Sequence, residues 1–151
     1  MAEEDYVSAL EKTVPIILSG LLEQGFQFLG IKRWSKDRLI GTHYEALLEN
    51  WAAGRRVSVT LYPAALDRPD AVGLTISIIR ASRLHVVAYL KKHGASEDEI
   101  AKFFLVSHQG SLEERLRAVL LAFRDFLDRP ALQDIVAGKE WESAEYGRLD
   151  D

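Results

Sequence analysis

The sequence predicts an α+β fold, in which helices cover one face of a four-stranded antiparallel sheet. Segments with alternating apolar and polar residues occupy the middle of the chain, between residues 25 and 80. Apolar residues spaced three and four apart, the pattern of amphipathic helices, occupy both ends. Strand and helix patterns are therefore segregated along the chain, which is typical of α+β domains.

The length predicts one domain. A chain of 151 residues, of which 48% are hydrophobic, can bury one core and is short for two. We assign this domain to residues 1–141. The segment ESAEYGRLDD after Trp141 has no apolar period, and we expect residues 142–151 to form a mobile acidic tail. No apolar run approaches the roughly 18 residues of a membrane span.

The first element is a helix predicted over residues 5–23. Its apolar stripe comprises Tyr6, Leu10, Val14, Ile17 and Leu21. Pro15 lies inside the pattern and has no backbone N–H to donate, so we expect the helix to kink or divide near it.

Four strands are predicted to follow as a meander. The first is the aromatic segment GFQFLGIKRW, and the second and third form a hairpin of residues 42–49 and 55–62. Between them, Asn50 and Gly54 supply the backbone conformations that a tight turn requires. The fourth strand, VGLTISIIR, places its apolar residues on one face and Thr75 and Ser77 on the other.

The remainder predicts three or four helices. The first runs from a Ser82 cap to a stop at Gly94. Two capping boxes, Ser96 with Glu99 and Ser111 with Glu114, mark further helix starts. A last helix is predicted over residues 130–137, capped by Asp128 and ended by Gly138.

Charge is distributed unevenly around the net value of −4. Residues 1–29 have a net charge of −4, residues 30–92 of +6 and residues 93–151 of −6. Acidic helices that pack beside a basic sheet would explain this pattern within the molecule. The alternative is a basic patch that binds an acidic surface.

Motifs for catalysis are absent from the sequence, which contains no phosphate-binding loop, nucleophile elbow or metalloprotease motif. We therefore expect no enzyme activity, no metal and no cofactor. The four histidines are scattered, and His85 and His93 would lie about 12 Å apart along one helix, too far for one metal ion. His108 lies close in the sequence to Ser111, so the two could act as a general base and a nucleophile. Ser111 is better explained as a helix cap.

Basic and aromatic residues cluster near the predicted turns. Lys36 and Arg38 fall at one end of the sheet, and Arg55 and Arg56 at the other. Trp34 and Trp51, also near turns, could stack on nucleic-acid bases. The negative net charge argues against nucleic-acid binding.

The sequence resembles small bacterial α+β proteins in four segments. These are LLEQGFQFLG, THYEALLENWAAGRRVSVTLYP, VGLTISIIR and the closing SLEERLRAVLLAFRDFL with PALQDIVAGKEW. Some of these proteins are similar to immunity proteins of toxin systems. The resemblance extends from about Leu21 to Trp141. It rests on the order of the elements, on the short motifs Gly-Phe and aromatic-Glu-Ala, and on a final Trp. It implies an inhibitor that blocks a toxin by binding, and it carries no residue roles, because binding surfaces differ among such proteins.

We therefore expect a non-catalytic module that binds a protein partner. The most specific form of this expectation is an immunity-type inhibitor that neutralises a toxin. Trp34, Trp51, Arg55 and Arg56 are the expected partner-binding residues, because exposed Trp and Arg dominate interface hot spots. The absence of cysteine favours a cytoplasmic location. Two alternatives stay open: a self-associating structural protein such as a homodimer, and an enzyme with an unrecognised motif.

Overall fold

The computed structural model describes residues 2–35 and 41–145. The elements in chain order are α1 (Glu3–Ile17), α2 (Ser19–Glu23), β1 (Gln27–Trp34), β2 (His43–Asn50), β3 (Arg55–Tyr62), β4 (Ala71–Ile78), β5 (Arg83–His85), α3 (Val86–Lys92), α4 (Glu97–Ala101), the 3₁₀ helix η1 (Leu105–Ser107), α5 (Leu112–Leu127) and α6 (Pro130–Val136).

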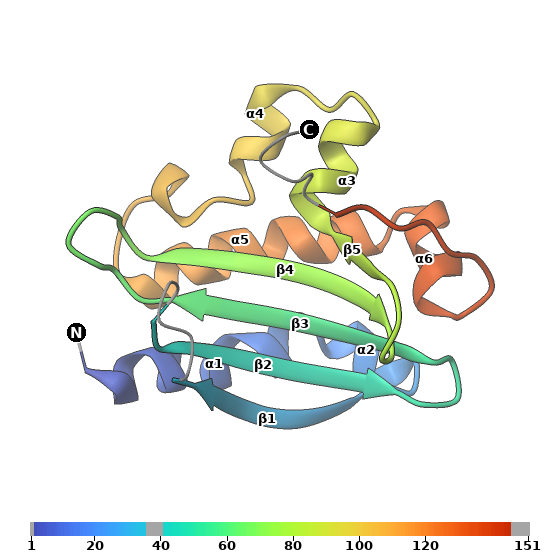
Figure 1. The fold of residues 1–151 in the computed structure, drawn as a ribbon, viewed down its shortest axis with the longest axis horizontal. Coiled ribbons are helices and arrows are strands. Elements are labelled where there is room, and N and C mark those ends of the chain that lie inside the picture. Colours follow the sequence, from blue (N-terminus) through green and yellow to red (C-terminus); the bar gives the residue numbers. More distant parts are fainter. Residues whose placement is uncertain (1, 36–40, 146–151) are drawn as a thin grey trace.

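The strands form one antiparallel sheet in the order β1-β2-β3-β4-β5 (Figure 1). This confirms an α+β fold with an N-terminal helix, an antiparallel meander and C-terminal helices. The predicted count of four strands is wrong, because β5 adds a fifth strand beside β4.

β5 occupies the place where we expected a helix to begin at Ser82. Its three residues pair with residues 75–77 of β4, and Leu84 forms a parallel bridge with Ala144 on the other side. Two hydrogen bonds hold that bridge, from the His85 amide to the Ala144 carbonyl at 2.7 Å and from the Ala144 amide to the Arg83 carbonyl at 3.1 Å. Because residues 83–85 pair with β4 and with Ala144, the helix begins only at Val86.

The predicted hairpin is confirmed by β2 and β3, which pair Glu49 with Arg56 and Asn50 with Arg55. The Asn50 Oδ1 atom accepts a hydrogen bond from the Ala53 amide at 3.1 Å. Gly54 has a φ of 69°, a conformation that costs little only for glycine. The two residues therefore shape the turn as expected.

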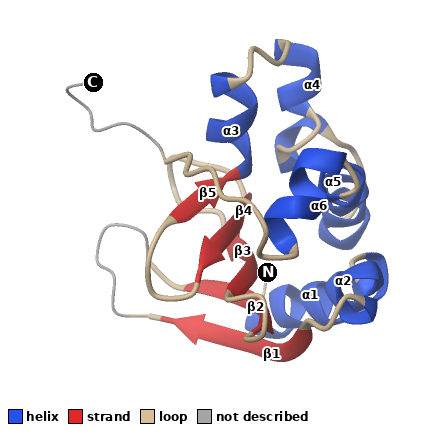
Figure 2. Ribbon diagram, turned by 90° about the vertical axis from the view of Figure 1, so that its right-hand side faces the viewer, coloured by secondary structure: helices blue, strands red, loops and turns tan. Residues whose placement is uncertain are grey.

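Helices α1, α2, α5 and α6 lie over one face of the sheet, as predicted (Figure 2). The expected division of the first helix is also confirmed, since Leu18 interrupts the helical conformation between α1 and α2, three residues after Pro15. Helices α3 and α4, which we also expected on this face, lie beyond the β5 edge instead.

A single core fills the space between the helices and this face. Leu48 and Val59 from the sheet, Leu10 from α1, and Leu116 and Phe123 from α5 are completely buried. Because each helix offers a continuous apolar stripe, the core is contiguous from the sheet to the outer helices.

The predicted capping of the C-terminal helices is confirmed in full at one position and in part at a second, and is wrong at a third. Ser111 and Glu114 form the capping box of α5. At α4 only one half of the predicted box is formed, in which the Ser96 hydroxyl accepts a hydrogen bond from the Glu99 amide at 3.1 Å. The assignment of Asp128 as a cap of α6 is wrong, because its amide bonds to the Arg124 carbonyl and completes α5. Arg129 therefore takes the N-cap position of α6.

Candidate binding face

The sheet has a second face that the described helices leave uncovered (Figure 2). Alternate residues of each strand point to it, opposite the buried apolar set. We call this the open face. By the strand register it carries Lys32 and Trp34 from β1; His43, Glu45, Leu47 and Glu49 from β2; Arg56, Ser58, Thr60 and Tyr62 from β3; and Gly73, Thr75 and Ser77 from β4.

Three aromatic rings form a row across the open face at the end where β1 finishes. The Trp34 and His43 rings stack with centroids 6.3 Å apart and planes 15° apart. The His43 and Tyr62 rings follow at 5.4 Å and 30°. We call these three residues the aromatic row. It arises because antiparallel register places Trp34 directly opposite His43.

Two polar contacts hold the first ring of the row. The Lys32 Nζ atom lies 3.9 Å from the Trp34 ring centroid, within the range of a cation–π interaction. The Trp34 Nε1–H donates a hydrogen bond to the Glu45 carboxylate at 3.2 Å. Trp34 nevertheless keeps 40% of its surface exposed. The ring is therefore held in position while still offering apolar area to solvent.

The predicted partner-binding residues fall into three different settings. Trp34 belongs to the aromatic row, whereas Trp51 follows β2 at the opposite end of the sheet and is 64% exposed. About eight strand residues separate the two ends, a distance of roughly 25 Å. Arg56 lies near Trp51 and forms an ion pair with Glu49 at 2.7 Å.

Arg55 is buried, so the expectation that it is an exposed contact residue is wrong. It is only 7% exposed, and its Nε–H and Nη2–H donate to the carbonyls of Ile135 at 2.8 Å and Glu140 at 3.0 Å. Burial lowers the pKa of its guanidinium. Arg55 points to the helix-covered face because it stands one residue from Arg56, and neighbouring strand residues face opposite sides.

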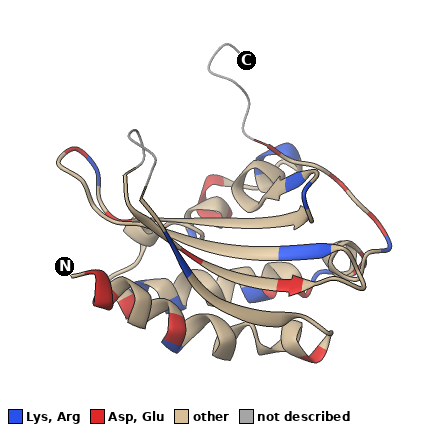
Figure 3. Cartoon of the chain, turned by 60° about the horizontal axis from the view of Figure 1, so that its bottom comes forward, with Lys and Arg blue, Asp and Glu red and all other residues tan. Residues whose placement is uncertain are grey.

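The basic middle of the chain is partly neutralised within the molecule. Arg33 of β1 forms an ion pair with Glu3 of α1 at 2.8 Å, and Lys92 of α3 forms one with Glu142 at 3.1 Å. Figure 3 marks basic positions on β1 and β3 and acidic positions at the start of α1. Lys36 and Arg38 lie outside the described residues.

The histidines and serines considered for catalysis have structural partners. The ring of His108 hydrogen-bonds through Nε2 to the Lys102 carbonyl at 2.9 Å, while Ser111 caps α5. His85 lies on β5 rather than on one helix with His93. Within residues 2–35 and 41–145, no three His, Cys, Asp or Glu side chains are grouped to hold a metal ion.

The sequence analysis did not name His43 and Tyr62 as candidate contact residues. A signal was nevertheless present, because the alternation of the predicted hairpin puts both on its polar side. An aromatic residue on the polar side of a strand does not serve the core and therefore indicates an exposed contact.

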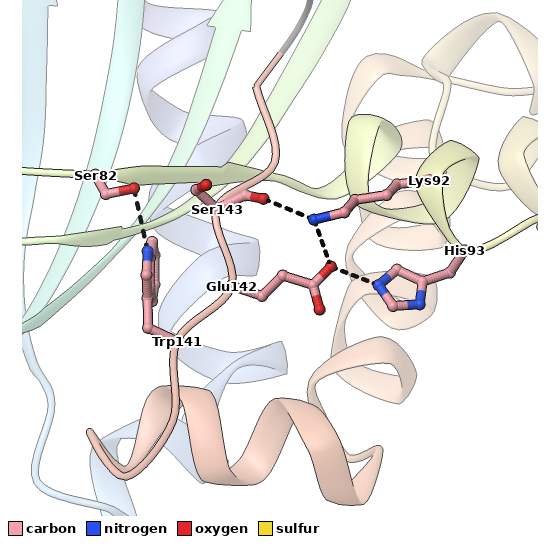
Figure 4. Close-up of polar contacts among 6 residues, drawn as sticks. All are labelled: Ser82, Lys92, His93, Trp141, Glu142 and Ser143. Carbon is pink, nitrogen blue, oxygen red and sulfur yellow. Dashed lines mark hydrogen bonds and ion pairs between the residues drawn. The ribbon is translucent and has the colours of Figure 1, made fainter.

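The segment that follows α6 runs back along β5 and α3 (Figure 4). The Trp141 Nε1–H donates to the Ser82 hydroxyl at 3.1 Å, and Glu142 contacts Lys92 at 3.1 Å and His93 at 2.6 Å. Burial acts to raise the pKa of Glu142, but its hydrogen bonds and the charges of these two partners outweigh burial and lower it. We call residues 141–145 the C-terminal strap. The predicted mobile tail overlaps it from residue 142, and its mobility stays a prediction.

No known protein family, characterised protein or solved structure matches this chain. None of the described helices is both long and apolar enough to cross a membrane. The open face and its aromatic row are therefore interpreted from their own chemistry.

Proposed function

We propose that this chain is a non-catalytic protein-binding module that binds its partner on the open face. The aromatic row is the observation that carries the proposal. Trp and Tyr are enriched at interface hot spots because they bury large areas and lose few rotamers on binding. In line with the resemblance of the sequence, we propose that the partner is a toxin that the chain neutralises in the cytoplasm.

The dimensions of the sheet fit an interface of ordinary size. A standard interface buries about 800 Å² on each partner, which corresponds to a patch roughly 30 Å across. A patch centred near the aromatic row would extend about 15 Å from it and would end before Trp51, which lies roughly 25 Å away. Trp34 would then contribute more binding energy than Trp51, because hot spots lie near the centre of an interface.

The charge of Lys32 favours a partner with an acidic surface. Its ammonium lies over the Trp34 ring rather than in an ion pair with a described carboxylate. A carboxylate on the partner could approach this ammonium while an apolar group covers the ring. Complementary charge of this kind accelerates association more than it increases affinity.

Affinity capture from a lysate of the source organism tests the proposal. We expect wild type to retain one stoichiometric protein, whose affinity falls about thirty-fold for Trp34→Ala. Ile16→Ala, which truncates an exposed apolar residue of α1, is the matched control and should retain full affinity. Trp51→Ala should have a smaller effect than Trp34→Ala.

A growth measurement tests whether the partner is a toxin. Expression of the captured protein alone should arrest growth, and co-expression of wild type, but not of Trp34→Ala, should restore it. If both variants protect equally, the aromatic row is not the inhibitory contact. If the captured protein does not affect growth, the chain would still be a protein-binding module, but its partner would not be a toxin.

Self-association is the main alternative, and β1 has features that oppose the simplest form of it. β1 is the edge strand, but its register with β2 shifts between Phe28 and Ile31, and Gly30 there has a φ of 91°. Such a bulge, together with Lys32 and Arg33, protects an edge from pairing with another sheet. A monomer in analytical ultracentrifugation would agree with this interpretation.

A further inference from the structure

A cavity of about 300 Å³ lies beside the first half of β4. β5 pairs only with residues 75–77, so residues 71–74 of β4 extend beyond it. The segment that follows α4 lies across from this part of the strand and contributes Phe103 and Phe104. The cavity therefore lies where β4 extends beyond the end of β5.

Apolar and hydrogen-bonding residues both line the cavity. The apolar residues include Val72, Leu74, Val87, Phe103 and Phe104. The hydrogen-bonding residues are Thr60, Tyr62, Thr75 and His85. This composition, mostly apolar with a few hydrogen-bonding groups, is typical of small-molecule sites, and the volume reaches the lower end of their range.

Gly73 allows the Tyr62 ring to lie close to the strand at the cavity. A Cβ atom at Gly73 would stand 3.3 Å from Tyr62 Cε2 and 3.6 Å from its hydroxyl oxygen. On the other side, the Thr75 hydroxyl lies 3.2 Å from His85 Nδ1 and orients the imidazole. Both polar groups are thus positioned by neighbours that belong to the sheet.

The lining is electrically neutral at pH 7. Burial, followed by the charge of Glu45, raises the pKa of Tyr62, so the phenol keeps its proton. Burial, followed by the charge of Arg83, lowers the pKa of His85, so the imidazole is uncharged. The charges of Arg68 and Arg83 act to lower the pKa of Tyr62, and the charge of Glu145 acts to raise the pKa of His85, but burial outweighs them in both cases.

We propose that this cavity binds a small, uncharged aromatic molecule. The phenylalanine rings favour a planar aromatic ligand, since paired aromatic rings gain stability beyond the area that they bury. The hydroxyl and imidazole groups can bond one polar atom of that ligand. A charged ligand is disfavoured because burying a charge without a dedicated counter-charge is costly. The cavity adjoins the open face and shares Tyr62 with the aromatic row, but its ligand is a small molecule rather than the proposed protein partner.

Titration with indole, followed by amide chemical shifts, tests the proposal on the full chain. We expect saturable shifts at Gly73, Thr75 and Val87, with a dissociation constant below about 1 mM. Indole-3-acetate, which adds a carboxylate to the same ring, should bind at least about tenfold more weakly. Tight binding of indole-3-acetate instead would overturn the neutral assignment.

Variants locate the site. Val87→Phe places a ring in the cavity and should weaken indole binding at least tenfold, whereas Val106→Phe makes the same change at an exposed position outside it. If Val87→Phe fails to fold, Phe104→Ala, at a position 39% exposed, removes one aromatic wall and should weaken binding as well. Equal affinity in wild type and the folded cavity variants, or shifts confined to other residues, would refute the site.

Discussion

The guanidinium of Arg55 lies over the ring of Trp141, with its central carbon 5.0 Å from the ring centroid. The same side chain bonds two carbonyls at the end of α6 and after it. Arg55 opens β3, so one buried residue joins the middle of the sheet to a segment more than eighty residues later in the chain. This contact positions the start of the C-terminal strap.

Arg55→Ala should destabilise the protein by about 3 kcal/mol, because it leaves buried carbonyls without donors. Arg55→Lys should recover part of this loss, since an ammonium cannot reproduce the forked geometry of the guanidinium. Urea unfolding measures both. Arg117→Ala removes an exposed ion pair with Glu113 and should change stability by less than about 0.5 kcal/mol. A similar cost for Arg117→Ala would show that charge, rather than the buried contacts, is responsible.

Tyr6 should make the protein sensitive to alkali. Burial and a 2.8 Å hydrogen bond to Asp70 raise the pKa of its phenol from 10.0 to about 12. The unfolded chain loses this proton first, so the stabilising contribution is complete below pH 10 and is lost as the pH rises toward 12. We expect Tyr6→Phe to be about 2 kcal/mol less stable at pH 7 and to approach wild type above pH 11. A constant difference across this range would contradict the assignment.

The C-terminal strap should loosen in acid. Because the pKa of Glu142 lies below its ordinary value of 4.5, its contribution is present above that pH and is lost as the pH falls through the lowered pKa. Glu142→Gln should therefore reduce protection of the His85 amide, which bonds to Ala144, at pH 6, and the difference from wild type should shrink as the pH falls through the lowered pKa. Amide hydrogen exchange measures this. Glu140→Gln, just before the strap, is the control and should exchange as wild type does.

Gly138 should tolerate no side chain. Its φ is 83°, and a Cβ atom there would lie 2.6 Å from the Ala53 carbonyl oxygen. Gly94 has a similar φ of 73° but open space around it, so Gly94→Ala reports the backbone cost alone, about 1 kcal/mol. Gly138→Ala should cost at least about 1 kcal/mol more in thermal unfolding. Equal costs would mean that the β2–β3 turn moves freely away from α6.

Periodicity alone predicted most of the secondary structure. The alternation of residues 57–61 identified β3, and the spacing from Leu112 to Leu127 identified α5. Both patterns repeat over several turns or residue pairs, so a misplaced boundary does not change the assignment. The strand that was missed, β5, has only three residues, too few for a pattern, and exists because β4 and Ala144 flank it.

The candidate residues of the open face were predictable only in part. Trp34 was chosen by residue type and is exposed, but Arg55 was chosen by the same rule and is buried. A one-residue offset along a strand decides between the two faces, and the helices decide which face is covered. The pairing of His43 with Trp34 and Tyr62 depends on the registers of two strand pairs, which no local pattern specifies.

The sequence by itself determined the α+β class, the β2–β3 hairpin, the capped helices and the absence of disulfides, since each follows from local spacing or composition. Tertiary structure decided the burial of Arg55, the assembly of the aromatic row and the cavity beside β4. These features bring together residues from elements far apart in the chain. Their geometry is set by packing and register, and neither is encoded in the neighbourhood of any one residue.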